Sequence, residues 1–330
     1  AFVGVGGRGS DNLNGLKSHN LVAFCDVDGE RAKANFEKWP NVPRYKDFRK
    51  MLDALESKID GVVISTPDHT HFHPAYQAIS LGKHVYLEKP LAHNVWETRT
   101  LCDLARKQGV ATQLGAQRHA LPNVHRVIEW IQSGAIGKVK EVHCWINGKR
   151  GMPSIPNDRP PVPSHLDWDL WLGPARSRPY HSSIAPYGWR FWWDYGTGET
   201  GNWGCHILDI PYWALGLRYP HSVRGSGPEV DAMRTPVSMR SRLEFDADNT
   251  STGGPVTLHW SHNEVGPAIL RKHGLEADGN NTLFVGSDGM LLCGFDKMKL
   301  LPEEKFSAPG KPSVSIPDSP GFYQEWVDAC

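Results

Sequence analysis

Short apolar runs alternate with amphipathic stretches over the first third of the chain. The apolar runs predict strands at residues 1–3, 21–25, 62–64, 84–87 and 110–114. Apolar side chains at helical spacing predict helices between them, at residues 30–38, 46–55, 75–81 and 95–108. Strands that alternate with helices form a parallel sheet with right-handed crossovers. We therefore predict a doubly wound α/β domain over residues 1–120.

The pattern changes from residue 139 onward. Val142, Cys144 and Ile146 alternate with polar residues, which is typical of an antiparallel strand with one solvated face. A loop with eight prolines follows, between Gly151 and Pro186. Further alternating runs lie near residues 237–247, 255–262, 281–287 and 290–301. We therefore predict a second, α+β domain over residues 121–330, built on a large open and mostly antiparallel sheet.

The composition argues against several classes of protein. The 36 basic and 36 acidic residues cancel and form no basic stripe, so we predict no nucleic-acid partner. No apolar run approaches the ~20 residues that cross a bilayer, so we predict no membrane partner. The six cysteines include no CxxC pair, which argues against a zinc ribbon or a disulfide scaffold. The chain starts inside a predicted strand and stops inside a predicted helix, so we expect trimmed ends. A cytoplasmic location is favoured, with export to the periplasm as the alternative.

A glycine-rich turn, GVGGRG at residues 4–9, directly follows the first predicted strand. Such a turn lets the backbone approach a pyrophosphate, and the N-terminus of the next helix favours the negative charge. Glycines also mark ordinary turns, so the position between a strand and a helix is what favours a dinucleotide site. The residues predicted to hold the cofactor here are Gly4, Gly6, Gly7, Arg8 and Gly9.

The second predicted strand ends at Asp26, 20 residues after Gly6. A carboxylate at that position accepts the ribose hydroxyls of NAD and repels the extra phosphate of NADP. Arg8 keeps NADP open as an alternative, because a nearby guanidinium pairs with a 2′-phosphate. We therefore predict that Asp26 binds the cofactor and that the cofactor is NAD.

Two further segments follow predicted strands, and ligands of doubly wound folds bind at the carboxyl ends of strands. Thr66-Pro67 comes after the strand at residues 62–64, and Glu88-Lys89-Pro90 ends the strand at residues 84–87. A lysine in a closed, partly desolvated site can exchange a proton with a substrate hydroxyl. The histidines at 69, 71 and 73 are interpreted as loop residues that line the cleft or face solvent. No cysteine or carboxylate completes a metal site there, so we predict no metal.

Together with a downstream Gly198…His206…Asp209 pattern, these motifs resemble the Gfo/Idh/MocA family, the glucose–fructose oxidoreductase and inositol dehydrogenase superfamily. The resemblance implies an NAD(P)-binding Rossmann domain followed by a domain for substrate binding and oligomerisation. It also implies that Lys89 lies beside the nicotinamide and the reacting carbinol. A later Asp-x-x-x-His segment of the family supplies a proton-transfer histidine, which matches His206.

Asn202 stands where that family has its aspartate. An amide holds a hydroxyl in place but cannot take its proton, so Lys89 and His206 remain as the titratable pair. Residues four apart on a helix share a face, so we expect Asn202 and His206 to reach one substrate. The implied catalytic residues are Lys89, His206 and Asn202.

The resemblance also implies binding residues around this centre. Its cofactor contacts are Thr66, Pro67, His71, Glu88, Lys89 and Gln117. Seven of the thirteen tryptophans fall within residues 168–213, and indole faces pack well on sugar rings. Trp168 and Trp171 have helix-like spacing and are predicted to pack in the core. The predicted substrate contacts are Lys89, Arg118, His119, Arg190, Trp192, Trp193, Asn202 and His206.

The leading hypothesis is an enzyme that transfers hydride between nicotinamide and a hydroxyl-bearing carbon of a sugar or polyol. One alternative is a glycosidase or lyase that uses retained NAD in an oxidation–elimination cycle. A second is a dinucleotide-binding regulator without catalysis. The expected partners are a small carbohydrate and further copies of the chain. An apolar face of an open sheet needs cover, and the sheet of relatives often packs against a partner, which predicts a homodimer or homotetramer.

Overall fold

The computed structural model describes residues 1–251, 253–306 and 310–330, and the chain divides into two compact units. Unit 1 consists of Ala1–Gly115, Pro153–Thr197 and Gly321–Cys330, and unit 2 consists of Ala116–Met152 and Gly198–Pro320. The predicted single boundary at residue 120 therefore does not account for two segments. Residues 153–197 and 321–330, expected in the second domain, belong to the first unit.

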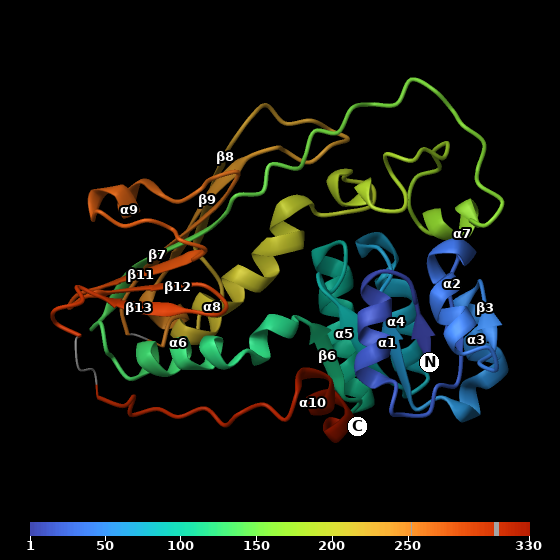
Figure 1. Cartoon of the computed structure of the whole chain (residues 1–330), viewed down its shortest axis with the longest axis horizontal. Coiled ribbons are helices and arrows are strands. Elements are labelled where there is room, and N and C mark those ends of the chain that lie inside the picture. The colour runs from blue at the N-terminus through green and yellow to red at the C-terminus, as the bar shows by residue number, and fades with distance from the viewer. Residues whose placement is uncertain (252, 307–309) are drawn as a thin grey trace. The chain divides into compact units, whose positions relative to one another are not determined.

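Unit 1 is built on a six-stranded parallel sheet with the strand order β3-β2-β1-β4-β5-β6 (Figure 1). Its strands are β1 (Phe2–Val3), β2 (Phe24–Cys25), β3 (Arg44–Tyr45), β4 (Gly61–Ile64), β5 (His84–Glu88) and β6 (Thr112–Gly115). Its crossover helices are α1 (Arg8–Leu16), α2 (Gly29–Lys38), α3 (Phe48–Leu55), α4 (Phe72–Ser80) and α5 (Val95–Gln108). This is the Rossmann order, whose ligand crevice lies where the order reverses, between β1 and β4. The predicted doubly wound sheet is confirmed.

Local sequence explains the helix ends of unit 1. The Asp28 carboxylate accepts hydrogen bonds from the first backbone N–H groups of α2, and the Asn94 side chain caps α5 in the same way. Gly109 ends α5 in the left-handed conformation, with φ +66°. The central strands β4 and β5 are apolar and almost completely buried, as expected for a parallel sheet covered on both faces.

The two added segments are attached to the Rossmann sheet by backbone hydrogen bonds and aromatic packing. The Gly29 N–H donates to the His165 carbonyl at 2.9 Å, and the Asp167 N–H donates to the Val27 carbonyl at 2.8 Å. Helix α7 (Trp168–Leu172) stacks the rings of Trp168 and Trp171 at 4.6 Å, which confirms the predicted packing of this pair. Helix α10 (Phe322–Ala329) buries Trp326 among the side chains of the same unit.

Unit 2 is built on a seven-stranded sheet with the order β13-β12-β11-β7-β10-β9-β8 (Figure 1). Its strands are β7 (Val139–Ile146), β8 (Ser222–Ser226), β9 (Met239–Phe245), β10 (Val256–His262), β11 (Thr282–Gly286), β12 (Met290–Cys293) and β13 (Met298–Leu301). All neighbouring strands are antiparallel except β7 and β10. The predicted, mostly antiparallel second sheet is confirmed.

Helices α6 (Pro122–Gln132) and α8 (Cys205–Leu215) cover one face of this sheet. Alternate residues of β7 and β10, such as Val142 and Leu258, are buried against them. The short helix α9 (Ala268–Lys272) packs with part of the opposite face through Leu270. None of the described helices is long and apolar enough to span a membrane.

Candidate functional site

The carboxyl ends of β1, β4 and β5 lie next to one another, because Ile64 pairs with both Val3 and Leu87. The loops that follow these strands therefore share one edge of the sheet. They carry the glycine-rich turn, Thr66-Pro67 and Glu88-Lys89-Pro90. Three motifs that are far apart in the sequence thus come together at the crevice of unit 1.

The glycine-rich turn has no room for side chains. Gly4 and Gly7 adopt positive φ values of +80° and +54°. A Cβ atom on Gly4 would lie 2.9 Å from the Ser65 carbonyl oxygen, and one on Gly9 would collide with the Gly4 carbonyl oxygen. The turn leads into α1 with Gly7 as its N-cap, and no side chain caps the first N–H groups of the helix. A turn of this kind at a helix N-terminus fits a pyrophosphate.

Asp26 is tied to this turn. Its Oδ2 accepts the N–H groups of Val5 at 2.9 Å and Gly6 at 3.3 Å, and its Oδ1 accepts the Asp28 N–H at 3.0 Å. Burial raises the pKa of Asp26, while these backbone hydrogen bonds act in the opposite direction. The carboxylate therefore fixes the shape of the turn, a role that the sequence did not suggest. Its contact with a ribose stays a prediction.

His71, predicted as a cofactor contact, is a buried link between two loops. Its Nε2 lies 2.8 Å from the Thr66 carbonyl oxygen, and its Nδ1 lies 2.7 Å from the Pro90 carbonyl oxygen. Both ring nitrogens are thus engaged by the main chain, so His71 acts as a positioning residue for the Lys89-Pro90 loop. The Thr66 hydroxyl is buried and has no hydrogen-bond partner among the described residues, so a bound ligand can satisfy it.

Glu88 also lies in a buried network. Its Oε1 accepts the Asn12 amide at 2.9 Å, and the same amide group donates to the Ser65 hydroxyl at 2.9 Å. The Tyr323 hydroxyl of α10 donates to the Asn12 carbonyl oxygen at 2.9 Å. The network holds the end of β5, and so the start of the Lys89 loop, against α1 and α10. No sequence motif points to this network, because its members are up to 311 positions apart.

Lys89 itself is half-buried, and a cis peptide bond joins it to Pro90. It belongs to unit 1, whereas Asn202 and His206 belong to unit 2. The joint action of these residues on one substrate therefore stays a prediction.

Asn202 is anchored to an ion pair in unit 2 whose carboxylate is buried. It lies in the π-helical turn Thr200–Gly204 that precedes α8, and its amide donates to Glu199 Oε2 at 3.3 Å. Glu199, 1% exposed, accepts two hydrogen bonds from the Arg150 guanidinium at 2.6 and 2.9 Å. His206 lies in the first turn of α8, and its ring makes an edge contact with Trp203. The sequence interpretation missed the Arg150–Glu199 pair.

Gln117, Arg118 and His119 form a 3₁₀ turn in unit 2. The Arg118 guanidinium lies 5.2 Å from the centre of the Trp203 ring, which also contacts His206. The His119 ring stacks on Trp213 at 4.1 Å. These contacts hold two predicted substrate residues against tryptophans, and the Trp203 contact links the 3₁₀ turn to the start of α8.

The predicted residues of the 153–197 segment differ in exposure. Trp192 is only 2% exposed and belongs to the core of unit 1, whereas Trp193 is 40% exposed. The Arg190 guanidinium lies 4.2 Å from the centre of the Trp189 ring. Of the two predicted tryptophans, only Trp193 offers substantial surface to a ligand.

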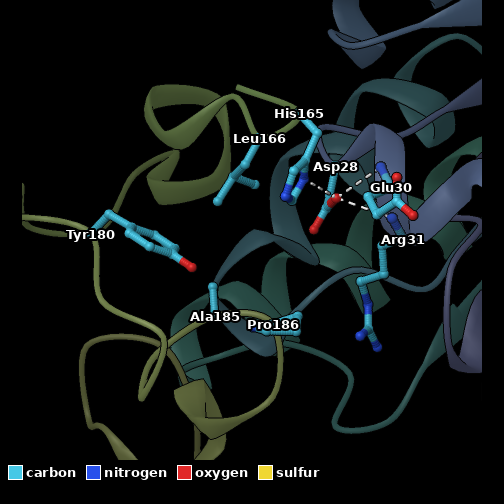
Figure 2. A pocket seen from close by; sticks show the side chains of 8 residues that line it. All are labelled: Asp28, Glu30, Arg31, His165, Leu166, Tyr180, Ala185 and Pro186. Atoms are coloured by element: carbon cyan, nitrogen blue, oxygen red, sulfur yellow. Dashed lines mark hydrogen bonds and ion pairs between the residues drawn. The ribbon is translucent and has the colours of Figure 1, made fainter. Parts of the chain in front are cut away.

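A pocket of about 310 Å³ in unit 1 was not anticipated (Figure 2). It is lined by Asp28, Glu30, Arg31, His165, Leu166, Tyr180, Ala185 and Pro186. Figure 2 shows residues at the start of α2 on one side and residues of the 153–197 segment on the other. The pocket is therefore assembled by the segment that the sequence had placed in the second domain.

Arg31 connects this pocket to the glycine-rich turn. A side chain at Gly7 would collide with the Arg31 guanidinium, so the two lie in direct proximity. Arg8, predicted as the cationic neighbour of the cofactor, pairs instead with Asp11 at 3.2 Å, and both side chains are more than half exposed. Arg31 is thus the guanidinium that the structure brings over the turn.

Comparison with known proteins identifies the family of both parts of the chain. Residues 1–116 match a model described as "Oxidoreductase family, NAD-binding Rossmann fold". Residues 127–233 match "Oxidoreductase family, C-terminal alpha/beta domain". The first match spans the Rossmann sheet, and the second includes β7 and β8 of the unit 2 sheet together with the 153–197 segment of unit 1.

Curated relatives match over part of their length. Inositol 2-dehydrogenase/D-chiro-inositol 3-dehydrogenase of Lactiplantibacillus plantarum is 29% identical over 42% of this chain and 40% of that protein. D-glucoside 3-dehydrogenase of Escherichia coli is 31% identical over 36% of this chain and 33% of that protein. The chain thus spans less than half the length of these relatives.

Solved structures share the fold at low identity. The WlbA dehydrogenase of Bordetella pertussis, in complex with NADH and UDP-GlcNAcA, has a TM-score of 0.64 at 16% identity, over 99% of this chain and 91% of that one. Levoglucosan dehydrogenase in complex with NADH has a TM-score of 0.63 at 17% identity, over 96% and 79%.

Proposed function

The chain belongs to the Gfo/Idh/MocA family of oxidoreductases, and we propose that it transfers hydride between NAD and a hydroxyl-bearing carbon of a sugar or polyol. The observation that carries this proposal is the alignment of the glycine-rich turn, Thr66 and Lys89 along one edge of the Rossmann sheet. Relatives that act on inositols and glucosides support the substrate class.

The residues at this edge fit NAD. The bare turn and the N-terminus of α1 suit the pyrophosphate, and the buried Thr66 hydroxyl offers a polar group without a partner among the described residues. Asp26 is held in place by three backbone N–H groups, and its remaining acceptor capacity is directed to a ribose hydroxyl. When bound, NAD supplies the hydride acceptor.

Lys89 handles the proton in this proposal. Its loop is held on one side by the His71 link to Pro90 and on the other by the buried Glu88. A fixed and half-buried ammonium group exchanges its proton with a substrate hydroxyl more efficiently than a mobile one, because the donor and acceptor stay aligned.

Unit 2 contributes substrate contacts in this proposal. The Asn202 amide donates to Glu199, and in this proposal the held side chain hydrogen-bonds a sugar hydroxyl. His206 lies four residues further on and orients the substrate or relays its proton. The Arg150–Glu199 pair fixes the amide and so sets which hydroxyl is accepted.

Purified protein incubated with NAD and a panel of inositols, glucosides and free sugars tests the proposal. We expect NADH to accumulate with at least one member of the panel. Cleavage of a glycoside without net NADH, by protein that retains NAD through purification, would instead establish the oxidation–elimination reaction. Protein that binds NAD but turns over no member of the panel would contradict the proposed enzyme activity.

A further inference from the structure

A histidine–carboxylate cluster lies in the centre of the unit 2 sheet, on the two strands that run parallel. Glu141 and His143 are two residues apart on β7 and so point to the same face. His259 on β10 pairs in register with His143. This is the face opposite α6 and α8, because those helices pack on the intervening residues Val142 and Leu258.

The donor atoms of the cluster converge. The Nε2 atoms of His143 and His259 each lie 3.0 Å from the same carboxylate oxygen, Glu141 Oε1. One ligand atom from each of the three residues lies within 4.8 Å of the others. Donors at about 2.1 Å from a tetrahedral zinc ion are roughly 3.4 Å apart, so each imidazole nitrogen must move slightly away from Glu141, and the two stacked rings must turn so that both lone pairs point at the ion.

Hydrogen bonding alone does not account well for this arrangement. The two rings stack in parallel at 4.6 Å, so two imidazolium charges there would repel. The Nε2 atom of His143 is buried, and its contact with Glu141 does not meet hydrogen-bond geometry. A cation bound by all three residues would give the buried His143 nitrogen a partner.

We propose that Glu141, His143 and His259 bind a divalent transition-metal ion of the Zn²⁺ class on this face of unit 2. Two imidazoles and one carboxylate are a donor set for zinc, and three protein ligands leave the fourth position for water or a further ligand. Glu141 and His259 are 40% and 32% exposed, so an ion can reach them from solvent, whereas His143 is only 12% exposed. Arg242 on β9 pairs in register with His259, but its guanidinium lies 2.7 Å from a Glu244 carboxylate oxygen. This ion pair reduces the repulsion between Arg242 and a bound cation.

No sequence motif indicates this site. The only closely spaced histidines considered as ligands were those at 69, 71 and 73. His143 and His259 are 116 positions apart (259 minus 143), and only the pairing of β7 with β10 brings them together.

Calorimetric titration of chelator-treated protein with Zn²⁺ alone tests the proposal. We expect about one equivalent to bind at micromolar concentration or below, and the double variant His143→Gln/His259→Gln to lose at least tenfold in affinity. His221→Gln is the matched control, because His221 also lies beside two carboxylates, Glu244 and Asp246, at the start of β8. Equal Zn²⁺ binding by wild type and double variant, or loss of binding in the control, would overturn the proposal.

A second measurement separates metal binding from folding. Zn²⁺ should raise the unfolding temperature of the wild type and of His221→Gln, because a ligand that binds only the folded state stabilises it. The single variant Glu141→Gln, which keeps the size of the side chain, should lose this rise while unfolding cooperatively on its own. An undiminished rise in Glu141→Gln would count against the site. Neither result depends on turnover, so the metal proposal and the proposed hydride transfer are tested separately.

Discussion

The imidazole of His71 joins the loop after β4 to the carbonyl oxygen of Pro90, 2.7 Å from its Nδ1, and Pro90 directly follows Lys89. His71→Phe removes this link and the contacts of the imidazole with the Thr66 and Pro90 carbonyl oxygens. We expect a loss of about 1–3 kcal/mol in the free energy of unfolding. We also expect turnover to fall more than NAD binding, because the Lys89 loop loses its support while the glycine-rich turn does not. Chemical denaturation and steady-state kinetics measure the two effects.

The exposed neighbour His73 provides the control for this variant. His73→Phe should leave both stability and turnover near the wild-type values. If His71→Phe lowered NAD affinity and turnover equally, His71 would contact the cofactor, as the sequence had predicted, rather than position the loop.

Lys89→Met tests the predicted proton-transfer group. Methionine has a similar volume but exchanges no proton, so we expect turnover to fall by roughly 10²–10⁴ while NAD binding stays within a few-fold. Lys83→Met is the matched control, since Lys83 precedes the other end of β5. Normal turnover by Lys89→Met would contradict the predicted role of Lys89 in proton transfer.

Asp26→Asn tests the carboxylate at the end of β2. The negative charge of Asp26 predicts at least a tenfold preference for NAD over NADP. The amide of Asp26→Asn should narrow this preference, because it does not repel a 2′-phosphate. Titration of wild type and variant with both cofactors measures the change. Tighter binding of NADP by the wild type would refute the assignment.

The same variant predicts a pH effect on stability. Because burial raises the pKa of Asp26 above its ordinary 3.8, folding favours the protonated carboxyl. The stabilisation is complete below that ordinary pKa and is lost as pH rises through the pKa of the folded state. Asparagine does not titrate, so Asp26→Asn should not lose stability in this way. The free energy of unfolding of the variant, relative to wild type, should therefore rise as pH increases from the ordinary pKa of Asp26 through its pKa in the folded state. Parallel stability–pH curves for the two proteins would contradict the pKa argument.

The sequence predicted what depends on local pattern, and it missed what depends on distant residues meeting. Gly4 and Lys89 were found because each directly follows a recognisable strand. Asn12 and Tyr323, which meet beside Glu88, are separated by nearly the whole chain and belong to no motif. Strand β3 was missed because its two residues are too short to show a period. The 153–197 segment has too many prolines for periodicity to assign it to either sheet.

Asn202, where the chain departs from its family, is placed next to Glu199. Asn202→Asp would bring a second carboxylate against Glu199, which is 1% exposed and already pairs with the Arg150 guanidinium. We expect the variant to lose about 1–3 kcal/mol in the free energy of unfolding at neutral pH. The loss should shrink as pH falls, since one of two adjacent carboxyl groups then binds a proton.

The double variant Glu199→Gln/Asn202→Asp is the control, because it exchanges the positions of the amide and the carboxylate and keeps one charge for Arg150. A double-mutant cycle on the two positions should therefore return much of the stability that Asn202→Asp loses. If Asn202→Asp were as stable as wild type at neutral pH, position 202 would not contact Glu199. If the variant also gained dehydrogenase activity, the carboxylate of the family would be compatible with both the stability and the activity of this chain. The Asn202 amide would then not be needed for its reaction.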